Sequence, residues 1–373
     1  MTLGAGGCGE HLEDAITDGA GADVAHLDGF AEEGGLRRFP MLPSLAVFTV
    51  LPCRRLLGAS PFPQPRASAQ GDASLSKPDE MSALFPEEPL VESAPLAHRL
   101  AQTHCRPLPV TGEDCAWYHG FWQYLRLMGL AKTSGGQGAF LIETLRGLAR
   151  AGESSRVMVS GSADYSMPAH ALWAYRAEGA AIRLAVVDRC EAPLALCRWY
   201  ADRQGGTIAT VCRDVRDHEP SEPMDVVFTN SFLGNFDPAS RPQLVAAWRR
   251  LLRPGGKVLF TNRLRPAAAA VLGFDGEQAR GFAEAVRHEA EARHAILGLD
   301  PDEAVRRARA YAERFQSFPV RSVDEIARLL TEGGFAIDLL EVATNPGRPG
   351  AAAVSGPSTE ERADYARVIA IRL

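Results

Sequence analysis

Short runs of apolar residues alternate with segments of helical pattern from residue 156 to the end of the chain. Five of these runs contain few polar positions, which is typical of parallel strands that crossover helices cover on both faces. They are "RVMVS" (156–160), "AIRLAVVD" (181–188), "TIATVCRD" (207–214), "MDVVFTN" (224–230) and "GKVLFTNR" (256–263), with helical patterns between them at 168–178, 191–203 and 240–252. A helix and a strand within 323–342 and a strand over 365–373 follow. The pattern predicts an α/β fold with a mostly parallel, seven-stranded sheet.

Further helical patterns flank the five strands. Before them, helices are predicted over 113–130, which Thr111 and Asp114 would open as a capping box, and over 138–151. After them, a charged stretch over 275–315 predicts two helices. We therefore expect an N-terminal helical segment (81–152) and an α/β domain (153–373) that carries a helical insert (275–316).

Residues 1–80 differ in composition from the rest of the chain. Gly, Ala, Pro and Ser dominate this segment and hydrophobic periodicity is absent. Such a segment cannot offset its ordering entropy by burying apolar surface. It is predicted to be a disordered extension, and Met81 is an alternative natural start to Met1.

The 373 residues carry a formal net charge of -6 and no basic stripe with interleaved aromatic residues, so nucleic acid is not expected as a partner. The best apolar window, residues 41–53, is short of the ~20 residues that a membrane span needs. Seven scattered cysteines without a CxxC pair argue against a disulfide framework and against a zinc site. We predict a cytoplasmic protein. A signal peptide ending near Ala69 and a homodimer are the alternatives left open.

The turn after the first predicted strand keeps the outline of a nucleotide-binding loop. It reads Gly161 to Ser166, a GxGxxG pattern in which Ala163 and Ser166 replace the second and third glycines. The first glycine of such a loop permits a tight bend, and the small second residue lets a ligand approach the backbone. Pro168 follows near the first turn of a helix, where its missing N–H has no cost. An ordinary strand-to-helix turn is the alternative interpretation.

Carboxylates end the next two predicted strands. Asp188 ends the second strand, where a carboxylate can accept hydrogen bonds from both hydroxyls of a ribose, and Asp214 ends the third. The alternative is that each aspartate only caps a helix. Because the carboxyl ends of parallel strands meet at one edge of a sheet, these tips and the Gly161 turn are predicted to form one crevice.

From about Trp117 to Leu373 the chain resembles the class I S-adenosylmethionine-dependent methyltransferases. The most specific segment is "LLRPGGKVLF" (251–260), which is similar to the turn and fifth strand of that family. The resemblance implies a Rossmann-like fold, S-adenosylmethionine as cofactor and a small-molecule substrate. The chain departs from the pattern in its glycine-poor loop and in the acid of the first strand. Met158 or Val159 replaces that acid, with Asp164 as a stand-in.

The resemblance also implies roles for individual residues. Gly161 and Ala163 would approach the methionine part of the cofactor, Asp188 would hold the ribose, and Asp214 with Val215 would flank the adenine. Asn230 and Ser231 would border the sulfonium. The full predicted cofactor set is Gly161, Ser162, Ala163, Asp164, Asp188, Arg189, Asp214, Val215, Asn230 and Ser231.

A general base would assist transfer to a protonated acceptor. The predicted catalytic residues are His119, Tyr118 and Asn230, and Tyr165 and His218 are further candidates for the base. The metal-dependent type of the family needs an Asp-Asn pair after the fourth strand, which "FTNSFLGNFDP" (228–238) lacks, so no metal is predicted.

The stretch "WYHGFWQYLRLMGL" (117–130) concentrates aromatic residues in one predicted helix. It is either a core helix or an aromatic lid that attracts a sulfonium by cation–π interaction. The predicted substrate contacts are Trp117, Tyr118, Phe121, Trp122, Phe232 and Asn235.

Three functions follow from the resemblance. The first is a methyltransferase that acts on a small molecule. The second is a cyclase or lyase that consumes S-adenosylmethionine and forms azetidine-2-carboxylate and methylthioadenosine. The third is a catalytically silent cofactor-binding protein. A dinucleotide-dependent oxidoreductase would use a similar crevice, but its fingerprint is richer in glycine.

Overall fold

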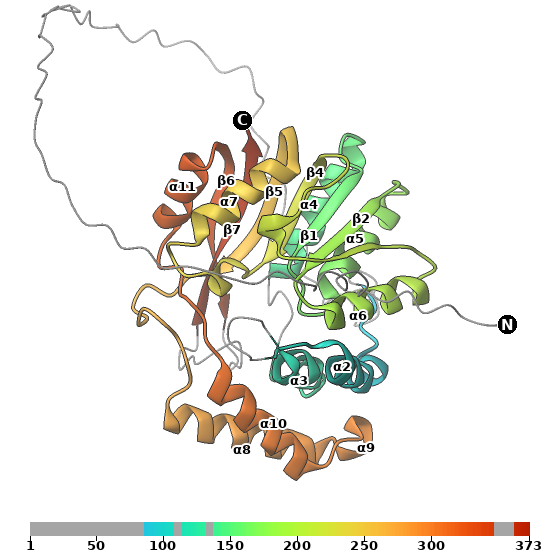
Figure 1. Ribbon diagram of the computed structural model, residues 1–373, viewed down its shortest axis with the longest axis vertical. Coiled ribbons are helices and arrows are strands. Elements are labelled where there is room, and N and C mark those ends of the chain that lie inside the picture. Colours follow the sequence, from blue (N-terminus) through green and yellow to red (C-terminus); the bar gives the residue numbers. More distant parts are fainter. Residues whose placement is uncertain (1–85, 108–113, 132–136, 347–361) are drawn as a thin grey trace, which may run out of the picture. The chain divides into compact units, whose positions relative to one another are not determined.

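The computed structural model describes residues 86–107, 114–131, 137–346 and 362–373. Within them, seven strands form one sheet in the order β3-β2-β1-β4-β5-β7-β6 (Figure 1). The strands are β1 (Arg156–Ser160), β2 (Arg183–Asp188), β3 (Ala209–Cys212), β4 (Met224–Asn230), β5 (Leu252–Arg263), β6 (Phe335–Pro346) and β7 (Arg362–Arg372). Strands β1 to β5 pair in parallel, whereas β7 lies antiparallel to both β5 and β6. The sheet is therefore mixed, and the prediction of a mostly parallel, seven-stranded sheet is confirmed.

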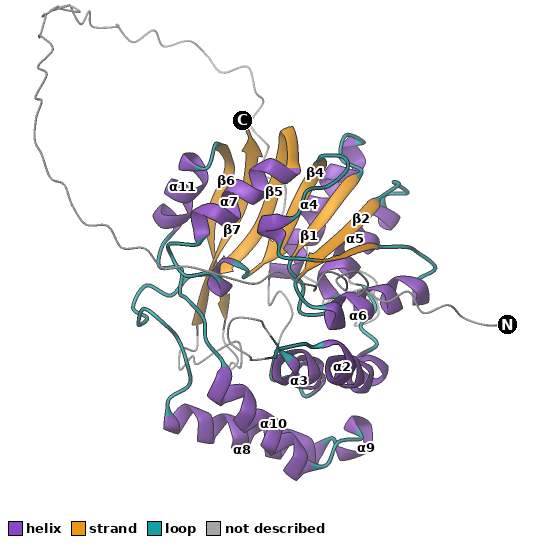
Figure 2. Cartoon of the chain, viewed as in Figure 1, coloured by secondary structure: helices purple, strands orange, loops and turns teal. Residues whose placement is uncertain are grey.

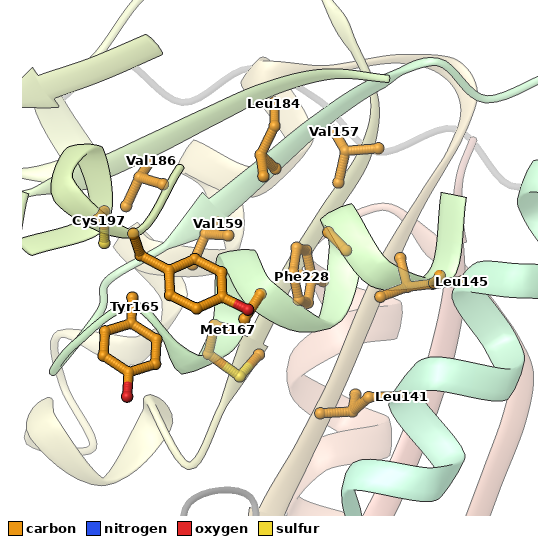
Figure 3. Close-up of a cluster of buried hydrophobic side chains, with 14 of the residues drawn as sticks. Leu141, Leu145, Val157, Val159, Tyr165, Met167, Leu184, Val186, Cys197 and Phe228 are labelled. Carbon is orange, nitrogen blue, oxygen red and sulfur yellow. The ribbon is translucent and has the colours of Figure 1, made fainter. Parts of the chain in front are cut away.

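The central strands are buried on both faces, as their apolar sequences predict. Successive side chains of β1 point to opposite faces: Val157 and Val159 enter one hydrophobic cluster and Met158 enters the other. Helices α4 (Gly138–Ala151), α5 (Ser166–Ala177) and α6 (Glu191–Arg203) contribute to the first cluster, and α7 (Arg241–Leu251) and α11 (Val323–Glu332) to the second. Figure 3 shows side chains of the first cluster, including Phe228 of β4.

The second glycine of the segment "RPGG" at the start of β5, Gly256, is required by close contacts with the backbone. A Cβ on Gly256 would lie 2.9 Å from the carbonyl oxygen of Arg253 and 3.1 Å from that of Asp225, so a side chain does not fit there. The carboxylate of Asp225 accepts hydrogen bonds from the backbone N–H of Arg156 at 2.9 Å and from Nε of Arg253 at 2.7 Å. Asp225 therefore joins the start of β1 to the turn that precedes the regular part of β5.

Two groups of helices lie outside the sheet layers. They are α2 (Leu90–His104) and α3 (Ala116–Leu127) before the sheet, and α8 (Gly276–Ala292), α9 (His294–Leu297) and α10 (Pro301–Arg314) after β5. Helix α2 packs on α3 and on α6, and α3 also packs on α10, which packs on α8 (Figure 2). None of the helices in the described ranges is long and apolar enough to cross a membrane.

Helix α3 is shorter than the sequence pattern predicts. It starts at Ala116, whose backbone N–H donates to Asp114 Oδ1 at 2.9 Å, and Cys115 occupies the N-cap position. Thr111, the predicted cap, lies outside the described residues, as does the predicted extension over 1–80. The charged stretch forms α8, α9 and α10, and the left-handed Gly298 ends α9.

Candidate functional site

The turn after β1 requires glycine at its first position. Gly161 has φ +73°, and a Cβ at this position would lie 2.2 Å from a ring carbon of Phe232. Its backbone N–H donates to the carbonyl of Val187 at 2.9 Å, which holds the turn against the end of β2. Since Ala163 and Ser166 replace the other two glycines, the loop keeps glycine at the position where the backbone conformation and Phe232 exclude a side chain.

Asp188 connects the tips of β1 and β2. Its Oδ2 accepts the backbone N–H of Ser162 at 2.9 Å, and its Oδ1 accepts that of Cys190 at 2.8 Å. Burial raises the pKa of this carboxyl above its ordinary value, although the two N–H donors and His119 act in the opposite direction. Each carboxylate oxygen has a second lone pair, so Asp188 can still accept hydroxyl donors from a ligand. The predicted neighbours Gly161, Ser162 and Asp188 therefore do lie together.

Asp214 and its neighbours lie at the tip of β3. The carboxylate of Asp214 caps the short 3₁₀ helix η2 (Val215–Asp217), accepting the N–H of Arg216 at 2.9 Å, and pairs with the Arg216 guanidinium at 2.8 Å. Burial alone would raise the pKa of Asp214, but the bonds to Arg216 lower it. Val215 is buried and Arg189 is exposed. The observed contacts of Asp214 are those of a cap, and its role beside an adenine stays a prediction.

The tip of β4 has an unusual backbone conformation. Ser231 has φ +52° and is the single residue other than glycine with a positive φ in the described part of the chain. Its N–H donates to the carbonyl of Thr261 at 2.7 Å, and Oδ1 of Asn230 accepts the Thr261 hydroxyl at 2.5 Å. Because Oδ1 is engaged, the amide nitrogen of Asn230 is the group left to donate to a ligand. Such outliers cluster at functional sites.

Two other predicted residues follow Ser231 in the chain. The ring of Phe232 lies over Gly161 and contacts Phe236 edge-on, with centroids 5.1 Å apart. Asn235 is exposed and ends the short helix η3 (Leu233–Asn235). The structure therefore brings Phe232 to the Gly161 turn and leaves Asn235 at the surface.

Asp164 forms a buried network with α3. Its Oδ2 accepts Nη1 of Arg126 at 2.7 Å and Nε2 of Gln123 at 3.1 Å, and its Oδ1 accepts the N–H of Ser166 at 2.8 Å. Burial alone would raise the pKa of Asp164, but the charge of Arg126 and the bonds to Ser166 and Gln123 lower it. The carboxylate therefore fixes α3 to the turn after β1, and we assign it to positioning rather than to contact with a cofactor.

Sequence reasoning missed Gln123 and Arg126. Their signal is two buried polar residues, three positions apart, in an otherwise apolar and aromatic helix. Such a pair must find partners when the helix is buried.

The aromatic residues of α3 form two groups. Phe121 and Tyr124 are buried among apolar side chains of the helical layer, whereas Trp117, Tyr118 and Trp122 are half-buried. Tyr118 stacks on Trp122 with centroids 5.6 Å apart, and on Tyr311 of α10 with centroids 6.0 Å apart. All five rings thus belong to or pack against one hydrophobic cluster, with Phe121 and Tyr124 buried in it and the other three partly exposed.

The hydroxyl of Tyr118 lies close enough to the strand tips for their charges to act on its pKa. Burial and the negative charges of Asp164 and Asp188 raise the pKa of its hydroxyl. The indole Nε1 of Trp122 is buried and has no hydrogen-bond partner among the described residues. A buried donor without a partner is rare in proteins and is consistent with a ligand that accepts this bond. Tyr311, which sequence reasoning missed, stacks on Tyr118 from α10 and is itself buried in the hydrophobic cluster.

The three other candidates for a general base lie in three different surroundings. The ring of Tyr165 is fully buried and stacks on Tyr200 with centroids 4.5 Å apart. His119 places Nδ1 3.6 Å from the sulfur of Cys105. His218 follows η2, and burial lowers its pKa. The structure therefore brings His119 edge-on against Tyr118, with ring centroids 5.3 Å apart, whereas Tyr165 lies in the core and His218 follows η2.

A separate groove lies between α8 and α10. Its cavity of about 490 Å³ is lined by residues such as Phe274, Ala283 and Val305, with Arg280 and Glu313 also in the lining. It includes none of the residues at the strand tips, so we do not count it as part of the candidate site.

The sheet order, the antiparallel β7 and the turn–carboxylate pair at β1 and β2 define a Rossmann-like methyltransferase fold. Residues 168–256 match a family model described as a methyltransferase domain. The matched segment runs from α5 into β5 and contains Asp188, Asp214 and Asn230, whereas the Gly161 turn and α3 precede it. The predicted resemblance to the class I methyltransferases is confirmed.

Solved structures with a similar fold include three methyltransferases. One is 1,6-didemethyltoxoflavin-N1-methyltransferase of Burkholderia thailandensis (15% identity, 82% of this chain and 94% of that chain, TM-score 0.41). The second is magnesium protoporphyrin IX methyltransferase of Synechocystis PCC 6803 (12% identity, 68% of this chain and 94% of that chain, TM-score 0.39). The third is the N-methyltransferase NodS of Bradyrhizobium japonicum WM9 (15% identity, 61% of this chain and 84% of that chain, TM-score 0.36). All three were crystallised with S-adenosylhomocysteine. Likeness at this level carries no inference about substrate, and no curated protein sequence matches the chain.

Proposed function

We propose that this protein is an S-adenosylmethionine-dependent methyltransferase that acts on a small-molecule acceptor. The observation that carries the proposal is the bond between Asp188, at the tip of β2, and the backbone of the Gly161–Ser162 turn after β1. This pair places a half-buried carboxylate beside a turn whose first residue has no side chain of its own, and the ring of Phe232 covers Gly161 at the position of a Cβ. A cofactor made of a nucleoside and an amino acid needs both features. The carboxylate would bind its ribose, and the turn would lie beside its amino-acid part.

The residues at the strand tips fit that cofactor. Asp188 would accept two ribose hydroxyls, and Gly161 with Ala163 would face the methionine part. Asp214 and Val215 would border the adenine, as the sequence resemblance implies. The amide nitrogen of Asn230 supplies a donor at the tip of β4, and Nε1 of Trp122, which has no partner among the described residues, is a further candidate donor.

The bound cofactor would supply a methyl group on a sulfonium, which is already an activated electrophile. The remaining work of the chain is to hold an acceptor in line with that group and to exclude water. Asn230, which Thr261 holds through Oδ1, is suited to orient the acceptor. The aromatic rings of Trp117, Tyr118 and Trp122 are suited to attract a sulfonium and to cover a flat or apolar acceptor.

The proposed reaction does not use His119 as a base. Its Nδ1 lies 3.6 Å from the sulfur of Cys105, so this nitrogen is directed at a thiol. The charges of Asp164 and Asp188 also act on Tyr118, but together with burial they raise the pKa of its hydroxyl and keep it protonated. A protonated Tyr118 can donate a hydrogen bond and cannot remove a proton. We therefore propose that Tyr118 orients, and that acceptors with a lone pair already available react best.

Mass spectrometry of the products tests the proposal. The full chain is incubated with S-adenosylmethionine alone and then with a panel of small amine, phenol and carboxylate acceptors. Formation of S-adenosylhomocysteine that depends on an acceptor supports the methyltransferase. Formation of methylthioadenosine without an acceptor would replace it by the cyclase or lyase, and tight binding without turnover would replace it by the silent binding protein. No binding by calorimetry would overturn the cofactor assignment itself.

A further inference from the structure

Three cysteines and one histidine converge beside the tip of β2. They are Cys105, Cys115, His119 and Cys190, and their three sulfurs and one ring nitrogen all lie within 4.8 Å of one another. The sulfurs of Cys105 and Cys190 are 3.5 Å apart, and the sulfur of Cys105 is 3.6 Å from Nδ1 of His119. Cys105 and Cys190 are buried, and the other two residues are half-buried.

Two of the six separations match the edges of a tetrahedral zinc site. Zinc–sulfur bonds of ~2.3 Å and zinc–nitrogen bonds of ~2.0 Å at tetrahedral angles place two sulfurs ~3.8 Å apart and a sulfur and a nitrogen ~3.5 Å apart. The separations of 3.5 Å between the sulfurs of Cys105 and Cys190 and of 3.6 Å between Cys105 and His119 agree with these values to within about 0.3 Å, and the other separations are no longer than 4.8 Å.

The four residues come from the ends of three helices. Cys105 is the residue after α2, Cys115 is the N-cap of α3 with His119 in the first turn of the same helix, and Cys190 is the N-cap of α6. The N-terminus of a helix carries a partial positive charge that stabilises anions. The N-terminal ends of α3 and α6 therefore favour the thiolate form that a metal requires, whereas the C-terminal end of α2, at Cys105, carries the opposite partial charge.

We propose that Cys105, Cys115, His119 and Cys190 bind one Zn²⁺ ion in a closed structural site. Three thiolates and one imidazole are a ligand set that zinc takes in structural sites, and four protein ligands leave no position open for water or substrate. Binding forms three Zn–S bonds and one Zn–N bond, and the three thiol protons are released to solvent. The sequence pattern argued against zinc because no two of these cysteines form a CxxC pair; tertiary packing assembles the set instead.

A zinc ion here would fasten α2 and α3 to the turn after β2. The backbone N–H of Cys190 donates to Asp188, so the metal would also fix the carboxylate that we propose for the ribose. This consequence rests on the proposed function, whereas metal binding does not. The two are separable because metal content is measured without any cofactor.

Metal analysis of the purified full chain is the first test. We expect about one zinc per chain by mass spectrometry of the elements, as four protein ligands hold a single ion. Loss of an outer hydrogen-bond partner costs ~10–100-fold in metal affinity, so Cys115→Ser and Cys190→Ser, which remove a direct ligand, should cost more. Cys212→Ser is the matched control, since Cys212 is exposed and outside the cluster, and it should keep its zinc. A combined Cys8→Ser and Cys53→Ser variant should also keep it; loss of zinc there would overturn the assignment.

Cobalt supplies a second readout that does not depend on the ligand variants folding. Reduced wild-type chain loaded with Co²⁺ should show the intense visible bands of tetrahedral cobalt and a thiolate-to-metal charge-transfer band. His119→Cys, which keeps four ligands, should still bind Co²⁺ with a stronger charge-transfer band. Weak octahedral bands or no bound metal would overturn the proposal, as would a Cys105–Cys190 disulfide located by peptide mapping of the non-reduced chain.

Discussion

Arg126 and Asp164 form a buried ion pair, with Nη1 and Oδ2 2.7 Å apart, that attaches α3 to the turn after β1. Arg126 also pairs with Glu88, and Asp164 also accepts bonds from Gln123 and Ser166. The position of the aromatic helix relative to the strand tips therefore depends on a charge pair with almost no access to solvent.

Arg126→Ala should destabilise the fold strongly. Removing one partner of a buried pair leaves an uncompensated charge, which typically costs ~3–5 kcal/mol. Urea denaturation measures the loss. Adding Asp164→Ala should recover part of it, because the second change removes the orphaned charge; strict additivity of the two losses would contradict the pairing.

Asp188→Asn should weaken cofactor binding, and it should also cost the fold one of the two backbone N–H bonds that Asp188 accepts. The amide offers one acceptor oxygen in place of two, so a ribose hydroxyl loses a charged partner at a cost on the order of 2–3 kcal/mol. Calorimetry with S-adenosylmethionine measures the affinity. Asp202→Asn on α6 is the matched control and should bind like wild type. Equal affinities for the two folded variants would refute the assignment of Asp188.

Trp122→Leu and Tyr118→Leu test whether the half-buried rings act on the reaction. If these rings exclude water and orient the acceptor, the variants should lose ~100-fold in rate. Phe121→Leu is the matched control: Phe121 is 1% exposed and belongs to the core, so this change should lower the melting temperature and leave the rate of the folded fraction intact. Melting temperature and single-turnover rate are compared on all three. If Trp122→Leu lowered the melting temperature but left the single-turnover rate intact, Trp122 would be a core residue only.

His170 should make the fold sensitive to mild acid. Burial, with a further contribution from Arg126, lowers the pKa of His170 to about 4 in the folded protein, and Asp164 opposes the shift. Its ordinary value is ~6.5, so the unfolded chain takes up the proton first as pH falls. Stability is therefore full above pH ~6.5 and decreases toward pH ~4, by on the order of 3 kcal/mol.

The matched variant for that prediction is His170→Leu, which cannot titrate. Its free energy of unfolding should be flatter than that of wild type between pH 4.5 and 7. Nδ1 of His170 is buried and has no hydrogen-bond partner among the residues that the structure describes, so the apolar replacement costs no hydrogen bond at that atom. Parallel pH profiles for the two proteins would show that His170 does not govern the acid sensitivity.

The hydrophobic pattern predicted the strands because a strand that is buried on both faces is apolar along its own short sequence. Met158 and Val159, for example, are apolar in sequence and lie on opposite faces of the sheet. Asp188 was predictable for the same reason, since the end of a buried strand marks the edge of the sheet. The expected start of the fifth strand at Gly256 was late, because β5 begins at Leu252.

The contacts of α3 could not be predicted from the sequence. Its pattern shows an aromatic helix but not the partner of each face, and that partner depends on how α2, α6 and α10 dock. Tyr311 reaches Tyr118 from a helix almost two hundred residues away, and Cys190 reaches Cys105 across a gap of 85 positions. Local periodicity carries no information on such separations.

Gly161 is restricted twice, by its positive φ and by the ring of Phe232 above it. Replacing Phe232 by a smaller residue would remove one restriction and leave the other. Among relatives that share this glycine-poor loop, Gly161 should therefore persist even where the ring is lost, whereas positions 163 and 166 should vary among small residues. A search profile that demands all three glycines would overlook such proteins, and one that weights the first glycine and the acid of Asp188 would find them.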